Sequence, residues 1–189
     1  MPKGATMAKE DAGTNQKIKG MGRRKTDNAT SLHWLWGSAA IVLFDQVSKA
    51  TVEAALPLHH TVELLPVFNL TLAHNPGAAF SLLAEAGGWQ RWFFSGLALI
   101  VSVGLVAWLR RLHPGAISEA LGITLILGGA LGNLWDRIQF GYVIDFIQLH
   151  WHDWYFPAFN VADSAITIGA GLLILDTLFT HGTTDTKHG

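Results

Sequence analysis

The sequence predicts an α-helical polytopic membrane protein with four transmembrane helices and a small sheet on the outer side of the membrane. Half of its 189 residues are hydrophobic and only 14% are charged, whereas soluble domains contain about 25% charged residues. Apolar runs of about 20 residues, the length that crosses a bilayer, occur four times. Lys and Arg residues are concentrated on one side of these runs, which predicts that this side faces the cytoplasm.

The four predicted spans run from about Leu32 to Leu56, Trp89 to Leu109, Ile117 to Trp135 and Asn160 to Thr180. With both termini inside, ten Lys and Arg residues lie on the inner side and three at the outer edge, so we place both termini in the cytoplasm. All eight Trp residues then fall at span ends, where amphipathic rings favour the headgroup level.

Residues 31–181 are predicted to form the membrane domain, flanked by a disordered cytoplasmic tail (1–30) and a short cytoplasmic C-terminal tail (182–189). The first tail carries seven Lys or Arg and few large apolar residues, a composition typical of disorder. No cleavable signal peptide is evident, so the first span is expected to act as an uncleaved anchor. The absence of cysteine excludes disulfides, thiolate metal sites and a cysteine nucleophile.

Two segments are predicted on the outer side. Residues Thr61 to Leu83 alternate apolar and polar side chains, which predicts short strands in a small sheet that lies on the membrane. The segment from Asp136 to Phe159 is aromatic and contains Pro157. For this second segment we expect a mixture of extended chain, short helix and loop.

Two aspartates lie in apolar surroundings near the predicted outer edge of the bundle. Asp145 stands in Val143-Ile-Asp-Phe-Ile147, and Asp163 begins the fourth span. An ionised Asp in hydrocarbon costs about 2.5 to 3.5 kcal/mol, so each needs a partner, a water cavity or a proton. Asp163 also has a structural interpretation, because Asn160 could cap this helix and the macrodipole favours an acid there. Two such carboxyls close together indicate acid–base chemistry.

Further polar residues precede these aspartates. Asp45 and Lys49 are four residues apart on one helical face, which suits an ion pair that anchors the outer end of the first span. A functional role requires Asp45 to contact the site of the other aspartates. Asn75-Pro-Gly77 marks a turn in which the small Gly77 permits close backbone approach and the Asn75 amide can both donate and accept.

The third span ends in Gly128-Gly-Ala-Leu-Gly132, followed by Asn133, Asp136 and Arg137. The glycines resemble part of a dinucleotide-binding fingerprint, but no strand precedes them, and close helix packing is the better interpretation. Asn133, Asp136 and Arg137 are expected to cluster at the outer mouth. There Arg137 could pair with Asp136 or hold a backbone carbonyl.

Several histidines fall on the outer side, and His150 and His152 could share one strand face. Since the His-Glu-x-x-His pattern is absent, we expect neither a metal site nor another cofactor.

Four ordered blocks together resemble lipoprotein signal peptidase (signal peptidase II), a family of bacterial inner-membrane aspartic peptidases. The blocks are Asp45-Gln-Val-Ser-Lys49, Asn75-Pro-Gly-Ala-Ala-Phe80, Gly132-Asn-Leu-Trp-Asp-Arg137 with Val143-Ile-Asp-Phe146, and Phe159-Asn-Val-Ala-Asp-Ser164. They cover about residues 32 to 180, and all fall on the predicted outer side. The two tails lie outside the resemblance.

The resemblance implies four transmembrane helices, a periplasmic β-cradle (57–88) and a periplasmic segment (136–159). It also implies removal of the signal peptide of a diacylglyceryl-modified prolipoprotein, by cleavage on the amino side of the lipid-modified cysteine. Asp145 and Asp163 match the catalytic pair. Asn75, Asn133, Arg137 and Asn160 match substrate-contacting positions, and Asp45, Lys49, Gly77 and Asp136 match supporting ones.

Intramembrane aspartates are also compatible with two other classes of function. A proton- or cation-coupled transporter could use Asp45, Asp145, Asp163 and Asp176 as relay groups, but only Asp176 lies toward the inner side. The other is a noncatalytic membrane scaffold. For the peptidase we expect prolipoprotein substrate and membrane lipid as partners, and no nucleic acid. A monomer suffices, because both aspartates lie in one chain.

Overall fold

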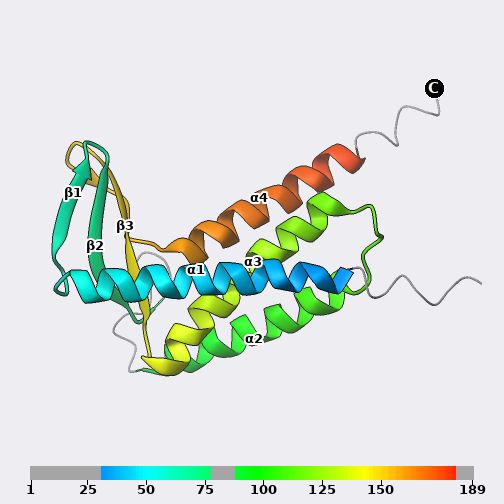
Figure 1. Cartoon of the computed structure of the whole chain (residues 1–189), viewed down its shortest axis with the longest axis horizontal. Coiled ribbons are helices and arrows are strands. Elements are labelled where there is room, and N and C mark those ends of the chain that lie inside the picture. The colour runs from blue at the N-terminus through cyan, green and yellow to red at the C-terminus, as the bar shows by residue number, and fades with distance from the viewer. Residues whose placement is uncertain (1–30, 78–87, 182–189) are drawn as a thin grey trace, which may run out of the picture.

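The computed structural model describes residues 31–77 and 88–181, and within them four α-helices carry a small antiparallel sheet at one end (Figure 1). The helices are α1 (Trp34–Ala55), α2 (Trp89–Leu109), α3 (Ile117–Gln139) and α4 (Val161–His181), and a short 3-10 turn, Ser31–His33, precedes α1. The strands are β1 (Thr61–Leu65), β2 (Phe68–Asn75), β3 (Val143–Trp151) and β4 (Trp154–Tyr155). The two predicted tails, and residues 78–87 of the predicted β-cradle, lie outside the described residues.

Helix α3 is the centre of the bundle, because α1, α2 and α4 all pack against it. A Cβ atom on Gly129 would lie within 2.8 Å of the Ile166 side chain and even closer to the Ala162 carbonyl oxygen of α4. A Cβ on Gly132 would lie 2.7 Å from the Asp45 carboxylate of α1. The glycines therefore allow the close helix packing that the sequence predicts.

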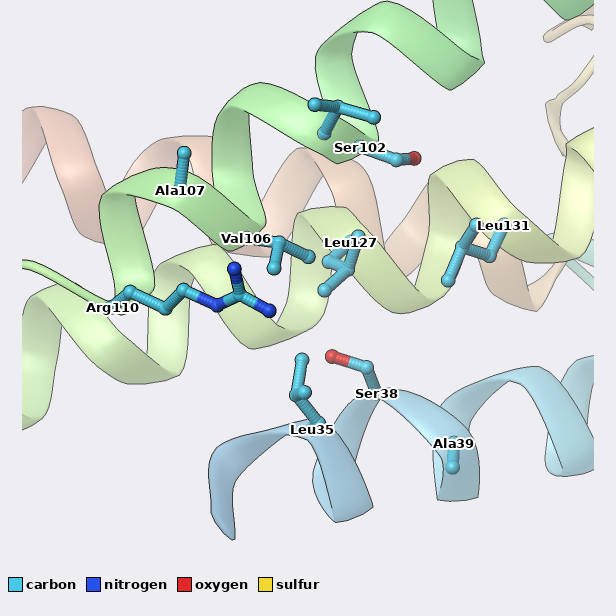
Figure 2. Close-up of a pocket in the computed structure, with 10 residues that line it drawn as sticks. Leu35, Ser38, Ala39, Ser102, Val106, Ala107, Arg110, Leu127 and Leu131 are labelled. Atoms are coloured by element: carbon cyan, nitrogen blue, oxygen red, sulfur yellow. The ribbon is translucent and has the colours of Figure 1, made fainter. Parts of the chain in front are cut away.

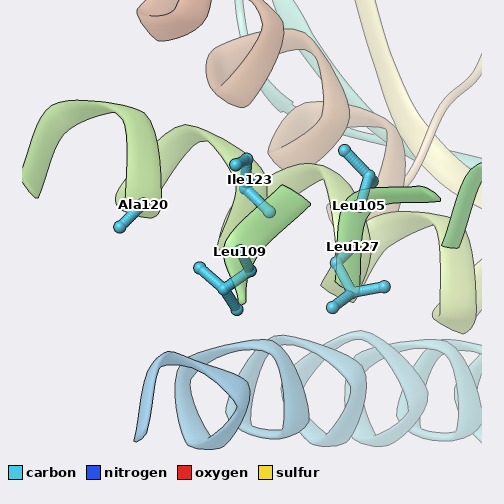
Figure 3. Packing of buried hydrophobic residues seen from close by; sticks show 5 residues of the cluster. All are labelled: Leu105, Leu109, Ala120, Ile123 and Leu127. Atoms are coloured by element: carbon cyan, nitrogen blue, oxygen red, sulfur yellow. The ribbon is translucent and has the colours of Figure 1, made fainter. Parts of the chain in front are cut away.

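The end of the bundle away from the sheet has an aliphatic core (Figure 3). Its buried residues come from α2 and α3, and Trp34 and Leu35 of α1 pack against them. The members are Leu105, Leu109, Ala120, Ile123 and Leu127. This core holds α1 and α2 against α3.

The sheet has the strand order β1-β2-β3-β4, and every neighbouring pair is antiparallel. Strand β3 comes from the segment between α3 and α4, yet it pairs with β2, with Ala73 opposite Asp145. The expected short helix in residues 136–159 is wrong. Residues 136–139 instead continue α3, and most of the remaining segment belongs to the sheet.

Three helical segments of the described chain have the length and apolar composition to cross a membrane: Trp89–Leu109, Ile117–Gln139 and Val161–Phe179. Helix α1 has 22 residues but contains Asp45, Lys49 and Glu53. Asp45 and Lys49 are buried within the bundle, while the side chains of Leu43, Phe44 and Val47 point outward. Most of the charge on α1 is therefore hidden from its outer face.

Candidate active site

Asp145 is placed by the register of the sheet. It lies opposite Ala73, so Asn75 is its diagonal neighbour on the same face of β2. The Asn75 side-chain amide donates to Asp145 Oδ2 at 3.0 Å, and the Asn160 amide donates to Asp145 Oδ1 at 2.7 Å. Asp145 is only 3% exposed. Two amide donors therefore satisfy a carboxyl that water scarcely reaches.

The start of α4 is tied to the same strand. The Phe159 carbonyl accepts from the backbone N–H groups of Phe146 and Ile147, and Phe159 N–H donates to Ile147 O. These bonds place Asn160 beside Asp145, and Asn160 is fully buried immediately before the first residue of α4. The Asn160 side chain also donates to Ile144 O at 3.2 Å.

Asp163 occupies the first turn of α4. Asn160 Oδ1 accepts from Asp163 N–H at 2.9 Å, and Asp163 Oδ2 accepts from Asn160 N–H at 3.3 Å. This reciprocal pair is a capping box, so the structural interpretation of Asp163 holds. The other oxygen, Oδ1, accepts from the Asn133 amide of α3 at 2.8 Å. One carboxyl thus caps its helix and also faces the polar cluster.

Asn133 connects the aspartates to a buried cluster of charges. Its Oδ1 accepts from Lys49 Nζ at 3.1 Å and from the Asn160 amide at 3.3 Å. Lys49 Nζ lies 2.7 Å from Asp45 Oδ2 and 2.8 Å from Asp136 Oδ2. The predicted Asp45–Lys49 pair is therefore confirmed, and it has a second acidic partner.

The acids of this cluster also hold backbone. Asp45 Oδ1 accepts from Ala162 N–H of α4 at 2.9 Å, and Asp136 Oδ2 accepts from Ile144 N–H of β3 at 3.2 Å. Each acid therefore fixes the strand or helix that carries one of the two site aspartates. Asp45 thus contacts the site through the backbone of α4, as a functional role requires. It does not contact the Asp145 or Asp163 carboxyl directly.

Arg137 holds backbone carbonyls, which was one of its two expected roles. Its guanidinium donates to Asn133 O and to Gly77 O, each at 3.3 Å. It also lies over the Phe94 ring, 5.3 Å from the centroid. Gly77 N–H donates to Asn75 Oδ1 at 3.0 Å, so Arg137 and Asn75 both hold the turn after β2.

Burial raises the pKa of Asp145 from an ordinary value of 3.8 to about 7, and the nearby charge of Asp163 acts in the same direction. Hydrogen bonds from Asn75 and Asn160 and the charge of Lys49 oppose this rise. Asp145 therefore exchanges its proton near neutral pH.

The structure brings together every site residue that the sequence indicated. They come from α1, α3, the start of α4, β3, and β2 with the turn that follows it. Gln46 was missed: its amide donates to Asp136 Oδ1 at 2.8 Å and to Asp45 Oδ2 at 3.2 Å. Its position within Asp45-Gln-Val-Ser-Lys49 was the available signal. Asp176, in contrast, lies 13 residues beyond Asp163 on α4, about 20 Å along a helix.

No cluster of three or more His, Cys, Asp or Glu side chains suited to a metal ion occurs among the residues that the structure describes. His74 stacks on Tyr142 and His150 on Tyr155. Both of these histidines therefore have aromatic neighbours.

The fold and the site define a helical membrane protein with two acidic side chains held at the junction of a bundle and a sheet, an arrangement suited to proton-transfer chemistry. A family model described as signal peptidase (SPase) II matches residues 38–179. The chain belongs to this peptidase family.

Relatives and solved structures agree with that assignment. The lipoprotein signal peptidase of Pseudomonas aeruginosa strain PAO1 is 49% identical over 165 residues, which cover 86% of this chain and 98% of the relative. That of Pseudomonas syringae pv. tomato is 56% identical over 147 residues, covering 77% of this chain and 85% of the relative. A bacterial membrane enzyme solved by the in meso method superposes with a TM-score of 0.74 at 30% identity, covering 88% of this chain and 98% of that one.

Proposed function

We propose that the protein is an aspartic endopeptidase that removes signal peptides from diacylglyceryl-modified prolipoproteins, cleaving on the amino side of the lipid-modified cysteine. The observation that carries the proposal is the linkage of Asp145 and Asp163 through Asn160, which donates its amide to one and its backbone N–H to the other. The names of the relatives support the substrate class.

In the proposed mechanism, a water molecule lies between the two carboxyls. Asp163 acts as the base that takes a proton from this water, and protonated Asp145 donates to the scissile carbonyl oxygen. The raised pKa of Asp145 supports its role as the acid. The hydrogen bond from Asn133 holds the Asp163 carboxyl toward the site. Asp163 then gives the proton it took from water to the amide nitrogen as the C–N bond breaks. Asp145 takes its proton back from the hydroxyl of the intermediate, which leaves the new carboxyl and the free amine.

The surrounding polar groups are proposed to position the peptide. The side-chain amides of three residues donate to the two aspartates and are therefore held in place: Asn75, Asn133 and Asn160. The Arg137 guanidinium, which holds the Asn133 and Gly77 carbonyls, is proposed to contact the peptide beside this turn. Asp45, Lys49, Gly77 and Asp136 act through backbone and side-chain contacts that hold these groups in place.

We place the protein in a bacterial inner membrane, with α1 as a fourth span, both termini in the cytoplasm and the site near the outer leaflet. The inward orientation of Asp45 and Lys49 supports a spanning α1, because its outer face is left apolar. Exposed aromatic residues on β3 and β4, including Trp151, Trp154 and Tyr155, suit the headgroup region beside the sheet. A substrate anchored by its signal helix and lipid would then arrive laterally.

The proposal is tested with the purified full chain in liposomes, using a diacylglyceryl-modified prolipoprotein peptide and the same peptide without lipid. We expect cleavage of the lipidated peptide only, with the modified cysteine as the new N-terminus by mass spectrometry. Cleavage elsewhere, or equal cleavage of both peptides, would contradict the proposed specificity. A proton flux dependent on Asp176, without peptide cleavage, would favour a transporter.

A further inference from the structure

A groove lies at the end of the bundle away from the aspartates. It has a volume of about 510 Å³, within the range of about 300–1,000 Å³ typical of ligand sites. Its walls are the first turns of α1 and the last turns of α2, and α3 forms its floor with Leu127 and Leu131. None of the residues that line the groove belongs to the candidate active site, so the groove is a separate feature.

The lining is apolar except for two serines and Arg110 at one end. Figure 2 shows the Arg110 side chain extending from α2 into the gap toward α1, near Val106 and Leu127. None of the salt bridges among the described residues involves Arg110. Arg110 is exposed, so its guanidinium can donate to an anionic group at this end of the groove. The groove therefore combines an apolar channel with a cation at its mouth.

The groove is elongated. Ser102 and Arg110 both line it and are eight residues apart, about 12 Å along α2. A flexible acyl chain extended along α2 fits an apolar channel of this length.

We propose that this groove binds an anionic phospholipid, with an acyl chain along the channel and the phosphate on Arg110. Charge argues against the signal helix of a substrate as the occupant, because signal peptides begin with a basic segment that Arg110 and Arg111 would repel. The predicted topology places the groove in the inner leaflet, which is rich in anionic lipid. The inference concerns lipid binding and does not depend on the peptidase activity.

The test measures lipid retained by the full chain after extraction from vesicles that contain equal amounts of phosphatidylglycerol and phosphatidylcholine, using native mass spectrometry. We expect the wild type to retain phosphatidylglycerol preferentially. Arg110→Gln should lower this retention about fivefold, because it removes the basic side chain that lines the groove. Arg111→Gln is the matched control, because Arg111 is also exposed but does not line the groove, and it should retain wild-type binding.

A second pair of variants tests the channel itself. Ala39→Trp should fill the groove and reduce retention of both lipids, whereas Ala40→Trp, on the neighbouring exposed position outside the lining, should not. The proposal is overturned if the wild type retains both lipids equally, or if Arg110→Gln and Arg111→Gln behave alike. It is also overturned if Ala39→Trp retains phosphatidylglycerol but raises the KM for the lipidated peptide, since the substrate would then occupy the groove.

Discussion

Asn160 contacts both aspartates, and it uses different atoms for each. Its amide donates to Asp145 Oδ1, while its backbone N–H and Oδ1 form the capping box with Asp163. Because Asn160 is fully buried, water does not replace these bonds. Asn160 therefore contributes directly to the relative position of the two carboxyls.

Replacing Asn160 with Ala tests this role. We expect kcat to fall about 100-fold through misplacement of the carboxyls, and stability to fall by about 1 kcal/mol through loss of the cap. The lost hydrogen bond favoured the ionised form of Asp145, so its pKa rises and the alkaline limb of the pH–rate profile moves to higher pH. Asn69→Ala, which removes a buried amide that bonds Gln148, is the control and should leave that limb unchanged.

The raised pKa of Asp145 also predicts a pH dependence of stability. The folded state binds this proton more tightly than the unfolded state, so the contribution to the free energy of unfolding is complete below about pH 4 and is lost as pH rises toward 7. Asp145→Asn should therefore lose less stability than the wild type between pH 5 and pH 8 in thermal unfolding. Equal losses would contradict the raised pKa, and Asp153→Asn, on an exposed turn, should match the wild type.

Helix α3 carries Asn133, Asp136 and Arg137, and it also packs closely against the first turn of α4. The contact is close because Gly129 faces the Ala162 backbone, one residue before Asp163. A side chain on this face of α3 would displace the first turn of α4, and with it Asn160 and Asp163. The packing of two helices thus sets the geometry of the site.

Gly129→Ala should destabilise the protein by about 1–3 kcal/mol, because the added methyl group must displace backbone. We also expect at least a tenfold loss of kcat, since the displaced turn carries Asp163. The matched control is Gly104→Ala on α2, where a Cβ meets nothing within 4 Å. Thermal unfolding and peptide cleavage by both variants provide the measurement, and equal behaviour of the two would contradict the packing account.

The sequence predicted the helices and the site residues better than it predicted their connections. Apolar runs and charged flanks located the helices to within a few residues, and the four blocks indicated Asp145 and Asp163. That β3 pairs with β2 was not predicted, because local alternation does not identify a distant partner strand. Gln46 was missed for a similar reason, since its hydrogen bond to Asp136 joins residues that are 90 positions apart in the sequence.

For the whole molecule, the arrangement of buried charge explains how α1 can lie in a membrane. Lys49 is 1% exposed and contacts two acids, so the polar face of α1 is directed at α3 and not outward. Removing one member of such a group leaves the others buried without a partner, which is strongly destabilising. The charged cluster therefore belongs to the fold as well as to the site.

The proposed topology predicts which positions face each side of the membrane. Because the chain lacks cysteine, single cysteines can be labelled against an empty background. In intact spheroplasts, Glu63→Cys on β1 should react with a membrane-impermeant maleimide, whereas Ala5→Cys and Arg111→Cys should react only after lysis. Labelling of Ala5→Cys from the outside would contradict a spanning α1 with both termini in the cytoplasm.

The proposed catalytic pair is tested most directly by cleavage of the diacylglyceryl-modified peptide by Asp145→Asn and Asp163→Asn. Each variant should lose about 10²–10⁴-fold in kcat, the range of general acid–base catalysis, while thermal unfolding shows that it remains folded. Asp153→Asn and Asp176→Asn, which lie outside the network, should cleave like the wild type. Wild-type rates in either Asp145→Asn or Asp163→Asn would contradict the account.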